Sequence, residues 1–256
     1  MTTTSTQPVI EDTAVSVGGF SAWISRHWLF LILLVVLLWV GLPWLAPVFM
    51  ALGWTKAGEA IYLLYSAQCH QLPQRSFFIF GNKSMYSLSE VQAAWQDTTN
   101  PLILRQFVGN PEMGWKVAWS DRMVSMYSSI VLFGVILFLP LRKRLKPLPV
   151  GIFLLLLLPM AIDGGSHFVS DLLAPIGSGF RDSNLWLVNL TNNAFPATFY
   201  AGDALGSFNS WMRLITGILF GLAIVWFLFP HIRDGFTPDN KHKTPDERTY
   251  PSSSSR

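Results

Sequence analysis

The chain has 256 residues, 51% of them hydrophobic and only 13% charged, whereas about 25% of the residues of an ordinary soluble domain are charged. This composition and the positive mean hydropathy of +0.38 exclude an ordinary soluble protein and indicate an integral membrane protein, with the lipid bilayer as a partner. A net charge of +3 is too small to indicate nucleic acid, and one cysteine excludes a disulfide framework and a zinc site of several cysteines.

The N-terminal part of the chain combines a polar tail with a long apolar segment. Residues 1–20 are rich in threonine, serine and valine without clear periodicity, so we predict a disordered cytoplasmic tail. The segment 21–52 exceeds the roughly 20 apolar residues that cross a bilayer. It is too long for a signal peptide and has no obvious cleavage site, so we predict an uncleaved first transmembrane anchor.

The segment 53–117 is mixed in polarity. Residues 57–68 have the periodicity of a helix that is too short to span the membrane, so we predict that it lies at the interface. Ser87 and Glu90 form a capping-box pattern, which predicts the start of another short helix.

Three more segments are apolar enough to cross the bilayer. In the first of them, Asp121, Ser125 and Ser129 share one helix face, which must contact protein or water because hydrocarbon would leave it unpaired. In the last, Gly217 and Gly221 form a pattern typical of helices that pack closely. The predicted spans cover residues 118–139, 149–171 and 211–230.

The predicted fold class is therefore all-α, a membrane-embedded bundle of four transmembrane helices plus one interfacial helix. A membrane domain over 53–234 follows the first anchor, and we expect residues 174–210 to form a loop within it. Residues 235–256 are rich in lysine, proline and serine and predict a second disordered cytoplasmic tail.

A short basic loop at 141–146 predicts the orientation, because short loops rich in lysine and arginine stay in the cytoplasm. Counting spans from this loop gives a multi-pass protein of the cell membrane with both termini in the cytoplasm. The segments 53–117 and 165–210 then lie outside, so the polar ends of several predicted elements meet at the outer face.

Costly polar residues fall at these outer ends, and we expect them to line one pocket. Arg213 is expensive in lipid unless it snorkels or pairs, and we expect it to pair with Asp163. The candidate ligand-binding residues of this pocket are Cys69, His70, Arg75, Ser76, Asp121, Arg122, Asp163 and Arg213.

One helix face in the third span is a candidate metal site. Asp163, His167 and Asp171 fall at i, i+4 and i+8, a spacing that can bind a divalent ion. The alternative is that Asp163 pairs with Arg122 or Arg213 while the other two side chains are solvated.

The stretch from Cys69 to Phe78 allows several kinds of chemistry. Cys69 and His70 could ligate a metal or act as nucleophile and base, or they could be a buried thiol beside an interfacial histidine. Arg75 and Ser76 could bind a lipid phosphate or a carboxylate, although a snorkelling arginine is an equal alternative.

Four runs of this sequence resemble the bacterial and archaeal membrane proteins of domain-of-unknown-function family 2085. They lie at residues 69–77, 120–127, 163–164 and 213–221. The resemblance implies a helical membrane protein with a shared polar site over roughly 57–229, and it implies no reaction.

The chain departs from the family pattern in two places. Many relatives have Cys-x-Arg-Cys where this chain has Ser120-Asp-Arg-Met123, and they often have glutamine at the position of His167. Segment 185–208 looks like an insertion. If the family's site is a cysteine-rich metal or redox centre, most of it is therefore lost in this chain.

These observations lead to two functional hypotheses. The first is an outward-facing polar pocket that binds a metal ion or an anionic lipid-type ligand, with catalysis left open. The alternative is a non-enzymatic accessory or assembly subunit of a larger membrane complex, in which other subunits dock on the first span and on the asparagine-rich outer loop.

Overall fold

The computed structural model describes residues 17–236. It contains four helices long and apolar enough to cross a membrane, which confirms the predicted all-α bundle. The predicted tails at 1–16 and 237–256 lie outside the described residues, whereas residues 17–20 and 235–236 belong to helices. The long helices are Val17–Ala51 (α1), Asp121–Phe133 (α5), Val150–Leu173 (α7) and Phe208–Phe236 (α11), and α5 continues through a π-helical turn, Gly134–Phe138, into Leu139–Leu141 (α6).

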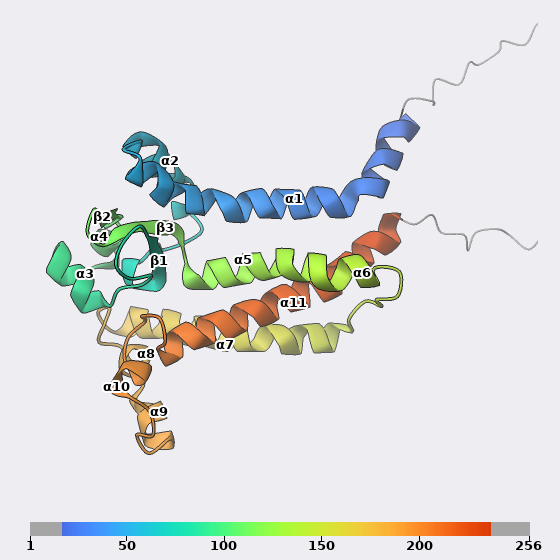
Figure 1. The fold of residues 1–256 in the computed structure, drawn as a ribbon. Helices are drawn as coiled ribbons and strands as arrows, with labels where there is room; N and C mark the ends of the chain where they lie inside the picture. Colours follow the sequence, from blue (N-terminus) through green and yellow to red (C-terminus); the bar gives the residue numbers. More distant parts are fainter. Residues whose placement is uncertain (1–16, 237–256) are drawn as a thin grey trace, which may run out of the picture.

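The small elements gather at one end of the long helices, and the described chain begins and ends at the other (Figure 1). α5, α7 and α11 run alongside one another, and α1 lies on the other side of α5. The Arg233 guanidinium near the end of α11 donates to the Leu145 carbonyl at 3.0 Å, which ties this end to the basic loop. At the opposite end, α7 ends and α5 and α11 begin, and the short segments connected to them lie close enough to form a single site (Figure 1).

A three-stranded antiparallel sheet at this end was not predicted. It consists of Ser76–Ile79 (β1), Gly109–Asn110 (β2) and Gly114–Ser120 (β3) in the order β1-β3-β2, and a 3₁₀ turn over Pro73–Arg75 precedes it. The second span, predicted to begin at about residue 118, begins at Asp121, because β3 pairs with β1 up to Ser120.

The other short helices confirm some predictions and correct one. The short helix predicted at about 57–68 is Thr55–Ser66 (α2), whose buried face includes Ile61 and Tyr65. The capping box of Ser87 and Glu90 begins Leu88–Ala94 (α3). Residues 174–210 contain helices rather than only a loop. The remaining helices are Pro101–Leu104 (α4), Phe180–Ser183 (α8), Leu185–Leu190 (α9) and Ala197–Tyr200 (α10).

Buried amides explain why the segment 174–210 folds. The Asn184 Nδ2 group donates to the carbonyl oxygens of Arg181 at 2.8 Å and Tyr200 at 2.7 Å. Asn209 Nδ2 donates to the Arg181 carbonyl at 2.7 Å. These bonds satisfy backbone groups that helices of this length leave unpaired, and they hold α8 against α11.

The closest helix packing joins α5 to α11, as the glycine pattern predicts. A Cβ atom on Gly217 would lie 1.9 Å from the Ser125 Oγ atom, and one on Gly221 would lie 1.9 Å from Ser129 Oγ. Ser125 Oγ also donates to the Arg213 carbonyl at 3.0 Å. Glycine therefore lets the two backbones approach, as small residues do in membrane helices.

Candidate functional site

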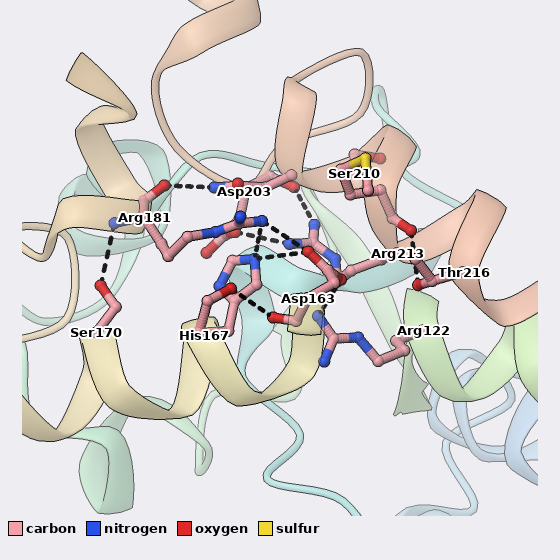
Figure 2. A network of polar contacts seen from close by, with 12 residues as sticks. Arg122, Asp163, His167, Ser170, Arg181, Asp203, Ser210, Arg213 and Thr216 are labelled. Carbon is pink, nitrogen blue, oxygen red and sulfur yellow. Dashed lines mark hydrogen bonds and ion pairs between the residues drawn. The ribbon is translucent and has the colours of Figure 1, made fainter. Parts of the chain in front are cut away.

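Charged side chains meet where α7 ends and where α5 and α11 begin, and Figure 2 shows Arg122, Asp163, Arg181, Asp203 and Arg213 of this group. Arg75 ends the 3₁₀ turn before β1, Arg122 lies in the first turn of α5, and Arg213 lies in the second turn of α11. Each of these arginines pairs with carboxylates from other parts of the fold. The ion-pair cluster consists of Arg75, Arg122, Arg181, Arg213, Asp121, Asp163, Asp171 and Asp203.

One continuous chain of ion pairs connects the 3₁₀ turn before β1 to α7 and α11. The Arg75 guanidinium donates to both oxygens of Asp171, at 2.5 and 2.9 Å, and to Asp203 Oδ2 at 2.6 Å. Arg213 donates to Asp203 Oδ1 at 2.7 Å and through Nε to both oxygens of Asp121 at 2.8 Å. Asp203 therefore bridges two arginines that lie far apart in the sequence.

A second set of contacts surrounds Asp163 on α7. Its Oδ2 atom accepts from Arg122 Nη2 at 2.7 Å, and its Oδ1 atom accepts from Arg181 Nη2 at 2.7 Å. The same Arg181 nitrogen lies 3.1 Å from His167 Nε2. Both oxygens of this buried carboxylate are thus paired with guanidinium groups.

The predicted pairing of Arg213 with Asp163 is wrong, and the alternative pairing with Arg122 is the one present. Close packing of α5 against α11 places Asp121 beside Arg213, at 2.8 Å. Asp163 projects from α7 toward the first turn of α5 and toward α8 instead.

Arg75 and Asp203 lie outside the membrane spans, and their oppositely charged neighbours keep both of them ionised. Burial opposes charge on Arg75 and Asp203. However, the Asp203 and Asp171 carboxylates raise the pKa of Arg75, and the arginines Arg75 and Arg213 lower the pKa of Asp203 well below its usual range. At neutral pH, Arg75 and Asp203 therefore carry opposite charges in a nearly water-free setting.

The candidate metal ligands do not meet at one point. Arg122 and Arg181 occupy the oxygens of Asp163, and Arg75 occupies both oxygens of Asp171. His167 Nε2 lies 4.0 Å from Asp163 Oδ1. Over residues 17–236 the structure contains no group of three or more histidine, cysteine, aspartate or glutamate side chains that could hold a metal ion.

A cavity of about 230 Å³ lies against the ion-pair cluster, and we call it the polar cavity. Arg122 is one of the lining residues, and its Nε atom is buried without a hydrogen-bond partner. His167 Nδ1 is likewise buried and unpaired. Three arginines face the cavity against one carboxylate. Its charged, imidazole and thiol lining groups come from Cys69, His70, Arg75, Arg122, His167, Asp171 and Arg213.

Three of the predicted site residues, Ser76, Asp121 and Asp163, lie beside the cavity without lining it. Ser76 Oγ donates to the Leu72 carbonyl at 2.9 Å. Asp121 pairs with Arg213, and Asp163 pairs with Arg122, so both carboxylates support arginines of the wall. The structure thus gathers most of the predicted set at one place.

The Cys69 thiol is buried at the edge of this cavity. Its Sγ atom accepts from the Gln71 N–H at 3.4 Å and from the Ser120 N–H at 3.3 Å. The neighbouring His70 Nδ1 accepts from the Leu72 N–H at 3.1 Å. A neutral His70 therefore carries its proton on Nε2, and backbone groups orient both side chains.

Sequence reasoning missed Arg181 and Asp203, two members of the cluster. A usable signal was present, because Arg181, Asp182 and Asp203 are the only charged residues between Asp171 and Arg213. All three are buried. Charged residues that become buried need partners, which is a reason to expect these three in the site.

Comparisons with known proteins agree with the predicted resemblance. The family model described as "Predicted membrane protein (DUF2085)" matches residues 112–227, which leaves the run at 69–77 outside the match. The chain is 26% identical over 194 residues to "Uncharacterized protein MJ1492" of Methanocaldococcus jannaschii, covering 73% of this chain and 80% of that protein. No solved structure matches.

Proposed function

We propose that this integral membrane protein binds a small oxyanion, such as a phosphate or carboxylate group, in the polar cavity. The observation that carries the proposal is Arg122, whose buried Nε atom has no partner while its Nη2 atom pairs with Asp163. A guanidinium fork matches the geometry of an oxyanion. A bound oxyanion would supply the missing acceptor.

The four arginines and four aspartates of the ion-pair cluster balance in charge, but the charged residues that line the cavity itself favour an anion over a cation. Arg75, Arg122 and Arg213 line it against the single carboxylate of Asp171, which is itself paired with Arg75. A buried donor without an acceptor costs about 1–3 kcal/mol. A ligand that accepts from Arg122 would recover this free energy.

The size of the cavity supports a small group. Its volume of about 230 Å³ is below the roughly 300–1,000 Å³ typical of pockets for drug-sized ligands. A free inorganic anion fits this volume, and so does the headgroup phosphate of a lipid. The shared chemistry is an oxyanion, and the source is a matter for experiment.

We further propose that the polar cavity faces outward, with both chain ends in the cytoplasm of a cell-membrane protein. The support is the short basic loop 141–146, since such loops remain cytoplasmic. This loop lies at the end of the bundle opposite β1 and the start of α5 (Figure 1), whereas residues next to these elements line the polar cavity. A ligand would then enter from the outer side.

The test is a binding titration on the full chain in lipid nanodiscs made only of phosphatidylcholine. One arm titrates orthophosphate, and the other titrates short-chain phosphatidylglycerol, so that a free anion and a lipid headgroup are distinguished. Arg122→Gln should weaken binding about tenfold or more, because a charge-assisted hydrogen bond contributes about 1.5–3 kcal/mol.

Lys56→Gln is the matched control, because Lys56 is exposed on α2 and the substitution removes one positive charge. It should leave the affinity unchanged. If neither anion binds the parent chain, or if both variants weaken binding equally, the oxyanion proposal is wrong.

A further inference from the structure

A second hollow of about 1040 Å³ lies on another side of Asp163, and we call it the lateral groove. Leucine and isoleucine side chains of α7 form one wall, residues 178–186 form a second, and Phe208 and Met212 of α11 complete it. The lining is mostly apolar along its length. Asp163, with its ion pairs to Arg122 and Arg181, separates the groove from the polar cavity.

The groove has the length and position of a lipid tail. The stretch of α7 from Leu155 to Ser166 is about 16 Å long at a rise of 1.5 Å per residue, which is about half of the ~30 Å hydrocarbon core. Leu155 is 64% and Ile162 62% exposed within this membrane span. The groove is therefore open sideways to the acyl chains of one leaflet.

Polar groups lie at only one end of the groove. Its polar lining residues are Asp163, Ser166, Ser178, Arg181 and Ser183, and both oxygens of Asp163 are already paired with arginines. The Arg181 side chain is only 8% exposed, and its Nε atom is buried without a hydrogen-bond partner. An apolar channel that ends at an incompletely paired guanidinium complements an amphiphile with an anionic head.

We propose that the lateral groove holds one acyl chain of a bilayer phospholipid, with the phosphate at Arg181. The walls of residues 178–186 would separate this lipid from the freely exchanging lipids around the other spans. A soluble ligand is disfavoured because the groove opens on hydrocarbon. This site is independent of the oxyanion proposed for the polar cavity.

The test uses phosphatidylglycerol with a diazirine in the middle of one acyl chain, incorporated into nanodiscs with the full chain. After illumination, peptide mass spectrometry maps the label. We expect enrichment on residues 155–162 and 180–186 over the equally lipid-exposed residues Val35 and Leu38 of α1.

Leu158→Trp should abolish this enrichment, because the larger side chain fills the groove. Leu154→Trp is the matched control, since Leu154 is exposed on α7 and does not line the groove. Leu158→Trp should also leave orthophosphate affinity unchanged, so that the two proposals succeed or fail separately.

Two results would overturn the groove proposal. One is label spread evenly over α1 and α7 in the parent chain. The other is a groove closed by a second copy of this chain, seen as crosslinks between copies at residues 155–162 together with loss of lipid label there.

Discussion

Two buried charged residues of this protein, Asp203 and Lys116, differ in whether a group of opposite charge is paired with them. Asp203 is 3% exposed and accepts from two arginines, so its charge is compensated on both sides. Lys116 on β3 is fully buried, yet its Nζ atom donates only to the carbonyl oxygens of Gln71 at 2.8 Å and Arg105 at 2.7 Å. Without a carboxylate partner, a buried ammonium is costly.

Because Lys116 has no carboxylate partner among the described residues, we expect the free energy of unfolding to depend on pH. Burial lowers the pKa of Lys116 to about 7, whereas an unfolded lysine keeps its proton until about pH 10.4. Between these values the unfolded state binds more protons, so stability rises with pH, by at most about 1.4 kcal/mol per unit. Lys116→Met should remove that rise.

The measurement is the thermal unfolding midpoint in detergent at several pH values between about 7 and 9.5. The slope of the midpoint against pH is compared between variant and parent, so that a loss of stability that is equal at every pH does not affect the result. Lys56→Met is the control, because Lys56 is exposed on α2. It should keep the parent slope. Equal slopes in the parent and Lys116→Met would show that Lys116 does not titrate in this range.

At the scale of elements, the packing of α5 on α11 sets the geometry of the site. Ser129 Oγ donates to the Gly217 carbonyl at 3.1 Å, so the helices approach closely enough for a side chain to reach the neighbouring backbone. About two turns earlier in α5, at the start of this helix, the same packing brings Asp121 to Arg213. A change in helix separation should therefore affect both stability and the ion pair.

Gly217→Ala tests this relation. The added Cβ would lie 1.9 Å from Ser125 Oγ and 2.8 Å from Ser125 Cβ. Overpacking of this kind typically costs about 1–3 kcal/mol, measured as a lower unfolding midpoint in detergent. Gly151→Ala is the matched control, because a Cβ there meets nothing within 4 Å. Equal midpoints for the two variants would contradict close packing at Gly217.

The three-stranded sheet is the part of the fold that hydrophobic periodicity in the sequence did not predict. The strand Gly114–Ser120 leads directly into the apolar helix that begins at Asp121. Its side chains are almost all buried, so the alternation that marks a half-exposed strand is missing. Pairing with β1, whose residues lie some forty positions earlier, is a tertiary property.

At the scale of the whole molecule, the described chain begins and ends at one end of the bundle, and the short elements lie at the other (Figure 1). The polar cavity is lined by residues at this second end. The proposed orientation puts Ala194 outside and Lys143 in the cytoplasm. Both residues are exposed, whereas the native Cys69 is buried. A cysteine introduced at either position can therefore be labelled from solution, and the parent chain, whose cysteine is buried, serves as the unlabelled control.

A membrane-impermeant maleimide applied to intact cells should label Ala194→Cys and not Lys143→Cys. After the membrane is opened, both variants should react, while the parent chain stays unlabelled. The reverse pattern in intact cells would put the polar cavity in the cytoplasm, and labelling of both variants would contradict the four-span topology.

The sequence by itself determined the spans, the close glycine packing and most members of the polar site. Hydrophobic length and helix periodicity are local properties, and charged residues in an apolar chain must be gathered away from lipid. Only the tertiary structure decided the partners. Arg75 and Asp203 are 128 positions apart, yet their atoms lie 2.6 Å from each other. Hydrogen bonding acts over such short distances that side-chain pairing depends on how the elements pack.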